Sequence, residues 1–132
     1  MLTVTVTSFS FIYGSYPKDD NSNGGGFVFD CRALPNPGRY EKYKALSGKD
    51  DAVSKYLEQQ EEVALFLDAV FKLVSQSVKK YQERSFENLQ VNFGCTGGQH
   101  RSVYSAERLT DYLNENFDIK VNLIHLREKI WG

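Results

Sequence analysis

The residues most able to do chemistry lie in one run, Gly94-Cys95-Thr96-Gly97-Gly98-Gln99-His100-Arg101-Ser102. This run follows a segment typical of a buried strand and precedes a segment with helical periodicity. The first turn of a helix leaves about four backbone N–H groups without partners, and these groups attract an anion together with the helix dipole. A glycine pair lets the backbone fold closely around a phosphate, because glycine has no Cβ. The run therefore predicts an anion-binding turn between a strand and a helix.

Side chains of the same run add hydrogen-bond donors to the predicted site. Arg101 offers two parallel N–H donors to phosphate oxygens. The hydroxyls of Thr96 and Ser102 add further bonds, and His100 donates another, with a charge when its pKa allows. The alternative is a glycine-rich turn that serves only as a connector. The predicted ligand-binding residues of the loop are Thr96, Gly97, Gly98, Gln99, His100, Arg101 and Ser102.

The spacing also permits a second chemistry, that of a cysteine phosphatase. The pattern Cys-x-x-Gly-x-x-Arg-Ser/Thr resembles the protein-tyrosine-phosphatase loop, and Cys95 and Arg101 occupy its nucleophile and phosphate-binding positions. A thiolate nucleophile would need a general acid for the leaving group, and Asp30 is the candidate. Gly94 replaces the histidine usual before the nucleophile, so we expect a non-catalytic loop in which Cys95 is packed.

A second polar group follows the strand expected at residues 27–30. Ligands bind beyond the carboxyl ends of parallel strands. If this strand neighbours the one before Gly94, then Asp30, Arg32 and Asn36 face the anion loop, where they would bind sugar hydroxyls, an amine or the phosphate. The alternative is a surface pair of Asp30 with Arg32, with Asn36 in a turn.

The periodicity of apolar residues predicts the elements that position these side chains. Four strands are predicted, at residues 2–13, 27–30, 89–93 and 119–125. In the first strand the alternation changes parity at Thr7 and Ser8, which indicates a bulge or the strand's end. Helical segments are predicted at residues 39–46, 52–60, 62–83 and 101–116, with Asp50 as the cap of the second. The segment 14–26 is a polar loop, either a lid or a mobile connector.

These elements predict a single α/β domain over residues 1–132. We expect three layers and a small, mostly parallel sheet of about four strands. Residues 89–125 form one strand–helix–strand unit, whose crossover should be right-handed.

Composition restricts the class of protein. The chain has 132 residues, 41% of them hydrophobic and 25% charged, with a net charge of −1, so it has no basic excess to attract nucleic acid or a membrane surface. Its two cysteines make no disulfide framework, and the first residues are not a signal peptide. We predict a cytoplasmic protein with no membrane span, cofactor or metal site, in which Cys31 is a core residue and His125 is either packed or solvated.

Several motifs resemble a known family, the C-terminal domain of RapZ, the bacterial RNase adapter protein. The matching motifs occur in the same order and are specific: residues 8–14, residues 27–32, Leu34-Pro35-Asn36-Pro37, Leu46-Ser47-Gly48 and residues 95–104. The likeness implies a regulatory domain that senses glucosamine-6-phosphate, binds small RNAs, contacts partner proteins and helps to form oligomers. It also implies a pocket built from Thr96, Gly97, Gly98, His100, Arg101, Asp30 and Arg32.

Three departures from the family pattern modify these expectations. This sequence has no Gly-x-x-x-x-Gly-Lys-Ser/Thr motif, and so lacks that means of binding ATP or GTP. Gly38 replaces the histidine often found after Leu-Pro-Asn-Pro, which bears on sugar specificity. The basic C-terminal cluster is reduced to Arg127 and Lys129, so the electrostatic attraction for RNA is weak. We therefore expect a sugar-phosphate sensor that signals to a partner.

Overall fold

The structure is a computed structural model and describes residues 1–18 and 25–131. Its sheet has four parallel strands. The strands are β1 (Thr3–Ser10), β2 (Gly26–Asp30), β3 (Asn88–Cys95) and β4 (Lys120–His125). Their spatial order is β2-β3-β1-β4, and every neighbouring pair is parallel. The prediction of an α/β protein with a parallel sheet of about four strands is therefore confirmed.

Strand β1 continues without a bulge at Thr7 and Ser8, where a bulge was one of the two expectations. Its register against β3 runs without interruption through Thr7 and Ser8, and the strand ends at Ser10 rather than Tyr13. The parity change arises because Phe9 is apolar on the face opposite Val4 and Val6. Both faces of β1 are buried at this end, which explains why apolar residues occur at both parities there.

Among the described residues, the helical elements are two short 3-10 turns and four helices. Their bounds are Pro37–Arg39, Glu41–Tyr43, α1 (Asp51–Glu58), α2 (Glu61–Glu83), α3 (Arg101–Asn116) and α4 (Glu128–Trp131). Asp50 stands at the N-cap of α1 as predicted, but its side chain makes no bond to the helix. Its Oδ2 accepts instead from the Ser47 amide at 2.7 Å, which closes the preceding turn.

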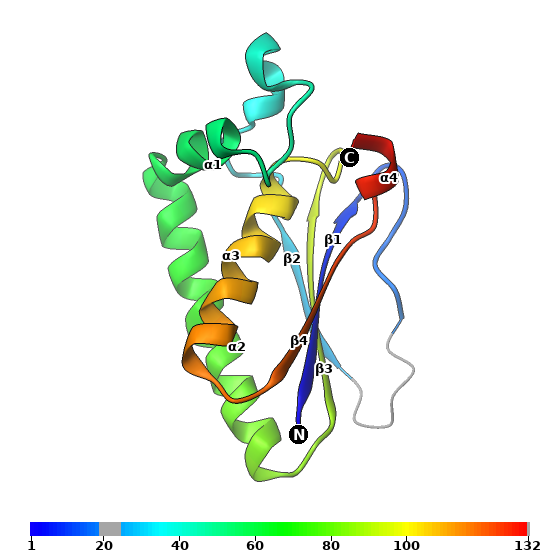
Figure 1. The fold of residues 1–132 in the computed structure, drawn as a ribbon, viewed down its shortest axis with the longest axis vertical. Coiled ribbons are helices and arrows are strands. Elements are labelled where there is room, and N and C mark those ends of the chain that lie inside the picture. Colours follow the sequence, from blue (N-terminus) through cyan, green and yellow to red (C-terminus); the bar gives the residue numbers. More distant parts are fainter. Residues whose placement is uncertain (19–24, 132) are drawn as a thin grey trace.

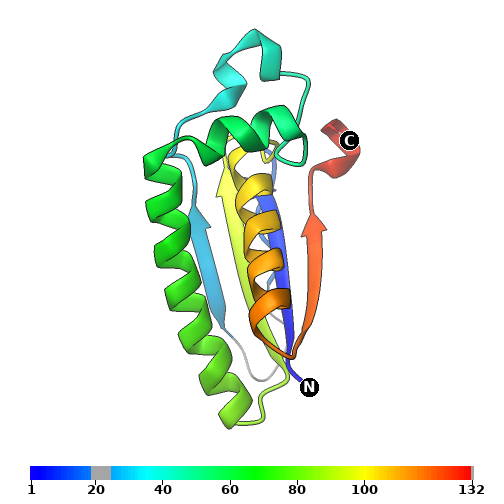
Figure 2. The same cartoon turned by 60° about the vertical axis from the view of Figure 1, so that its left-hand side comes forward.

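The three longer helices lie on one face of the sheet (Figures 1 and 2). The path from β2 through α1 and α2 to β3, and that from β3 through α3 to β4, move across the sheet in the same direction. Right-handed crossovers then place both sets of helices on the same side. One apolar core fills the space between this face and the helices. No described helix is long and apolar enough to cross a membrane.

The opposite face has no long helix in the described part of the chain. The part of the β1–β2 connection that the structure describes before residue 19 runs on that side without a helix (Figure 1). Three aromatic rings cover the end of this face. The ring centroid of Phe9 lies 4.8 Å from that of Phe11 and 5.6 Å from that of Tyr16. The suggested lid covers residues 14–26, and residues 19–24 lie outside the described part.

Candidate functional site

The glycine loop (residues 96–100) joins the end of β3 to the first turn of α3. Gly98 adopts a positive φ of +67°, a conformation that favours glycine. The first amide here that donates to a backbone carbonyl is that of Tyr104, to the His100 carbonyl at 3.0 Å. In the described part of the chain, no amide of residues 97–103 donates to a protein acceptor. These N–H groups are the donors that an anion would need.

A pocket of about 200 Å³ opens on the loop. This is below the range of about 300–1,000 Å³ typical of small-molecule sites, so it has room for a phosphate group and part of what the phosphate is attached to. The pocket is lined by Asn36, Gly38, Cys95, Thr96, Gly97, Gln99, His100 and Arg101. The parallel pairing of β2 with β3, which the sequence argument took as its condition, brings the Asn36 segment beside the loop.

Arg101 lies in this pocket but is largely engaged by the protein. Its Nη1 donates to the Arg32 carbonyl at 2.7 Å and to the Leu34 carbonyl at 3.0 Å, and its Nη2 lies 3.4 Å from the Thr96 hydroxyl. The residue is only 5% exposed. Its Nε–H is buried and has no hydrogen-bond partner in the described residues. Arg101 therefore braces the segment after β2, and the Nε–H and one N–H of Nη2 have no acceptor among the described residues.

His100 is held in one orientation by the backbone. Its Nε2 lies 2.9 Å from the Tyr43 carbonyl, and because a carbonyl only accepts, Nε2 carries the proton. Burial lowers the pKa of His100 below its ordinary value of 6.5, and the hydrogen bonds to the Tyr43 and Leu46 carbonyls oppose that effect. The neutral ring then has Nδ1 as an acceptor. A Cβ added at Gly38 would lie 3.2 Å from this Nδ1, so glycine keeps a side chain at position 38 from crowding the atom.

The side chains of Gln99 and Ser102 make their hydrogen bonds within the protein, which does not favour a ligand-binding role for them. The Gln99 side-chain amide donates to the Lys44 carbonyl at 2.8 Å and to the Leu46 carbonyl at 2.7 Å. Ser102 is fully buried, and its hydroxyl lies 3.1 Å from the Cys95 sulfur. Both side chains hold the loop in place, although the Gln99 side still forms part of the pocket lining.

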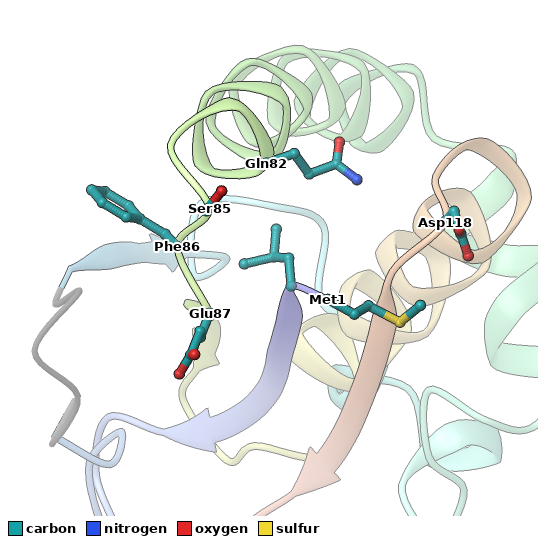
Figure 3. Close-up of a pocket in the computed structure, with 7 residues that line it drawn as sticks. Met1, Gln82, Ser85, Phe86, Glu87 and Asp118 are labelled. Atoms are coloured by element: carbon teal, nitrogen blue, oxygen red, sulfur yellow. The ribbon is translucent and has the colours of Figure 1, made fainter.

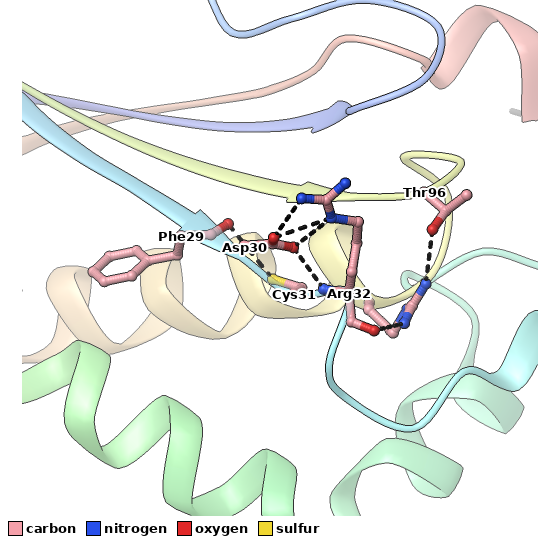
Figure 4. Close-up of polar contacts among 6 residues, drawn as sticks. Phe29, Asp30, Cys31, Arg32 and Thr96 are labelled. Carbon is pink, nitrogen blue, oxygen red and sulfur yellow. Dashed lines mark hydrogen bonds and ion pairs between the residues drawn. The ribbon is translucent and has the colours of Figure 1, made fainter.

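Asp30 and Arg32 bind each other at the edge of this region (Figure 4). Arg32 Nε and Nη2 donate to the carboxylate at 2.9 and 2.7 Å, and the guanidinium stacks 4.0 Å from the Phe11 ring centroid. This hydrogen bond keeps the pKa of Asp30 below its usual value. Neither side chain lines the pocket, so the structure matches the surface-pair alternative. Asn36 does line it, while its Oδ1 accepts from the Gly38 amide at 3.0 Å.

The two cysteines are packed, as expected, and His125 matches the packed one of its two alternatives. Cys31 and Cys95 are both free and buried, and burial raises the pKa of Cys31 well above its ordinary value. His125 bridges Ser8 and Glu107, with its Nδ1 2.6 Å from the serine hydroxyl and its Nε2 2.7 Å from the carboxylate. No group of metal-binding side chains occurs among the residues that the structure describes.

Sequence reasoning missed two side chains that hold the glycine loop from outside. The Ser10 hydroxyl donates to the Thr96 carbonyl at 2.6 Å, and the Trp131 indole N–H donates to the Gly98 carbonyl at 3.0 Å. The alternation of serine with apolar residues in β1 predicted a strand, but it did not indicate that the Ser10 hydroxyl binds the loop. A lone tryptophan near the end of the chain gave no signal for a contact with residue 98.

A larger pocket lies at the other end of the sheet, between the start of β1 and the end of α2 (Figure 3). Its volume is about 320 Å³, and its lining includes the carboxylates Glu87 and Asp118 but no lysine or arginine. The amino ends of parallel strands are not where ligands usually bind. We therefore assign the candidate site to the glycine loop.

The family model described as the RapZ C-terminal domain matches residues 2–129. A protein named "Nucleotide-binding protein" from Staphylococcus carnosus is 39% identical over 123 residues, which are 93% of this chain and 38% of that protein. A protein of the same description from Bacillus velezensis is 41% identical over 115 residues, which are 87% of this chain and 37% of that protein. The chain thus spans less than two fifths of the length of these relatives.

Proposed function

This chain belongs to the RapZ C-terminal domain family, and from that premise we propose that it is a non-catalytic module that binds a phosphorylated small molecule at the glycine loop. The observation that carries the proposal is the set of amides at residues 97–103, which have no protein acceptor in the described part of the chain. Arg101 also lines this pocket, and its positive charge favours an anion there. Donors fixed before the ligand arrives favour an anion without a cost of rearrangement.

The far end of the ligand is proposed to be a sugar that carries a hydrogen-bond donor, with glucosamine-6-phosphate as the first candidate. His100 Nδ1 is an acceptor beside Gly38, and a hydroxyl or ammonium group would bind it. Asn36 has a side-chain N–H₂ group on the same pocket, which would bind a sugar oxygen. The nucleotide-binding name of the relatives refers to longer proteins, of which the greater part has no counterpart in this chain.

Backbone amide NMR tests the site directly. Glucosamine-6-phosphate should shift the amides of Gly97 to Ser102 with a single saturating curve, whereas glucosamine without phosphate should shift them only weakly. Glucose-6-phosphate separates the amine's contribution from that of the hydroxyls. If the shifts saturate elsewhere and leave residues 97–102 unmoved, the site assignment is wrong.

A cysteine phosphatase is the second candidate function, favoured by the 3.1 Å approach of the Ser102 hydroxyl to the Cys95 sulfur. A hydroxyl placed there would stabilise a thiolate nucleophile. The general acid is the weak point, because Asp30 is bound by Arg32 and its lowered pKa keeps it ionised. Hydrolysis of an aryl phosphate by the wild type, abolished in Cys95→Ser, would favour this candidate over the binding module.

The proposal extends to output and location. We place the module in the cytoplasm, a reducing compartment, because both cysteines are free thiols. Signalling would pass to a protein partner or a second copy of the chain. RNA binding is the alternative output, and RNA affinity that falls steeply with salt would support it.

A further inference from the structure

The glycine loop has one open side and one packed side. A Cβ at Gly97 would have no atom within 4 Å, whereas a Cβ at Gly98 would lie 3.0 Å from Arg127 Cγ and 3.0 Å from the β1 backbone at Phe9 and Ser10. Ligand therefore approaches from the Gly97 side. The other side of the loop is in contact with the segment that follows β4.

That segment, residues 126–131, is attached to the loop and to two elements around it. Trp131 Nε1 donates to the Gly98 carbonyl at 3.0 Å, and Glu128 pairs with Lys49 at 3.6 Å. The Trp131 ring lies 5.9 Å from the His125 imidazole, which is bonded to β1 and α3. Arg127 places its guanidinium 4.8 Å from the Tyr13 ring centroid.

One peptide group connects the two sides of the loop. The Gly98 carbonyl belongs to the same peptide unit as the Gln99 N–H, which has no protein acceptor in the described residues. An anion that accepts from this N–H polarises the unit and makes the carbonyl a stronger acceptor, since linked hydrogen bonds reinforce one another. The Trp131 bond to that carbonyl then strengthens as well.

We propose that the C-terminal segment 126–131 senses occupancy of the glycine loop: phosphate on the Gly97 side tightens the docking of Trp131 on Gly98. This coupling rests on the proposed function. Because coupling between two equilibria is reciprocal, loss of the Trp131 contact weakens phosphate binding by the same factor. The exposed side chain of Ile130, on the same helix, is then held more firmly in place in the bound state.

The chain has a single tryptophan, so tryptophan fluorescence reports the surroundings of Trp131. Titration with glucosamine-6-phosphate, and separately with inorganic phosphate, should change the Trp131 emission with the same midpoint as the amide shifts of residues 97–102. Trp131→Phe keeps an aromatic ring and removes the donor, and it should weaken binding by about threefold, consistent with the loss of a fraction of one hydrogen bond. Ile130→Ala, on the same helix but 71% exposed, is the matched control and should leave affinity unchanged.

The outcomes separate the two proposals. If the amides shift and saturate while Trp131 emission stays constant and Trp131→Phe binds like the wild type, the coupling is wrong and the binding function stands. If no sugar phosphate or inorganic phosphate binds the wild type, both proposals are wrong. Equal weakening by Trp131→Phe and Ile130→Ala would assign the effect to helix stability and would also overturn the coupling.

Discussion

Replacement of Arg101 by methionine should destabilise the fold before it reveals anything about ligand binding. The Arg101 side chain is buried and donates to two backbone carbonyls, those of Arg32 and Leu34. A hydrogen bond from a charged group contributes about 1.5–3 kcal/mol, so we expect Arg101→Met to lower the free energy of unfolding by about 3–6 kcal/mol. Since small domains are stable by only about 5–15 kcal/mol, this is a large part of the total.

Urea denaturation followed by circular dichroism measures this loss. Arg108→Met is the matched control, because Arg108 lies on the same helix and forms an exposed i,i+3 pair with Asp111. Such pairs contribute about 0.2–1 kcal/mol, so the control should unfold close to the wild type. Arg101→Lys keeps the charge with one donor group and should fall between the two. A loss below about 1 kcal/mol for Arg101→Met would refute the bracing role of Arg101.

Three further predictions concern the same region. Gly48→Ala should destabilise the domain by more than about 1 kcal/mol, because the added Cβ would lie 2.4 Å from backbone atoms at the start of α3. Gly97→Ala, whose Cβ would have no atom within 4 Å, should unfold like the wild type and bind phosphate more weakly. Thermal melts check the stability of both variants, and NMR titration checks their phosphate binding. Folding lowers the pKa of His100, so as the pH falls the unfolded chain binds this proton before the folded protein does. The free energy of unfolding should therefore fall as the pH drops from 7 towards 5, by at most about 1.4 kcal/mol per pH unit, and it should fall less in His100→Gln. A difference between the two proteins that does not change with pH would contradict this. Cys31, fully buried and with a raised pKa, should resist a thiol reagent until the protein unfolds, and rapid labelling of the native protein would show that burial to be wrong.

The sheet and the position of the glycine loop could be predicted because they depend on local periodicity. Alternating apolar residues gave the strands, and the glycine pair between a strand and a helix gave the turn. The pairing of β2 with β3 was only a condition of the sequence argument, and it is the structure that shows it. Strand ends were less predictable, since Phe9 and Phe11 are apolar at the parity that alternation assigns to solvent.

The orientations of polar side chains could not be predicted, because the partners come from distant parts of the chain. Arg101 and Gln99 bind carbonyls of residues 32–46, and no sequence pattern marks a carbonyl as an acceptor. The contact of Trp131 with the Gly98 carbonyl likewise depends on tertiary packing, whereas the local pair of Asp30 with Arg32 was one of the two alternatives for that segment. Residue types therefore indicated that the region is polar and close to an anion site, but not which donors remain free.

The parallel arrangement around a central β1 also determines how the protein is best attached to a surface or a fusion partner. Strand β1 starts at the end of the sheet remote from the glycine loop, and its eight residues span roughly 26 Å, while α4 lies beside the loop (Figure 1). An affinity tag joined before Met1 leaves the glycine loop unobstructed. A tag joined after α4 adds its bulk directly to the Trp131 contact, so binding constants from the two formats should be compared before either is used for screening.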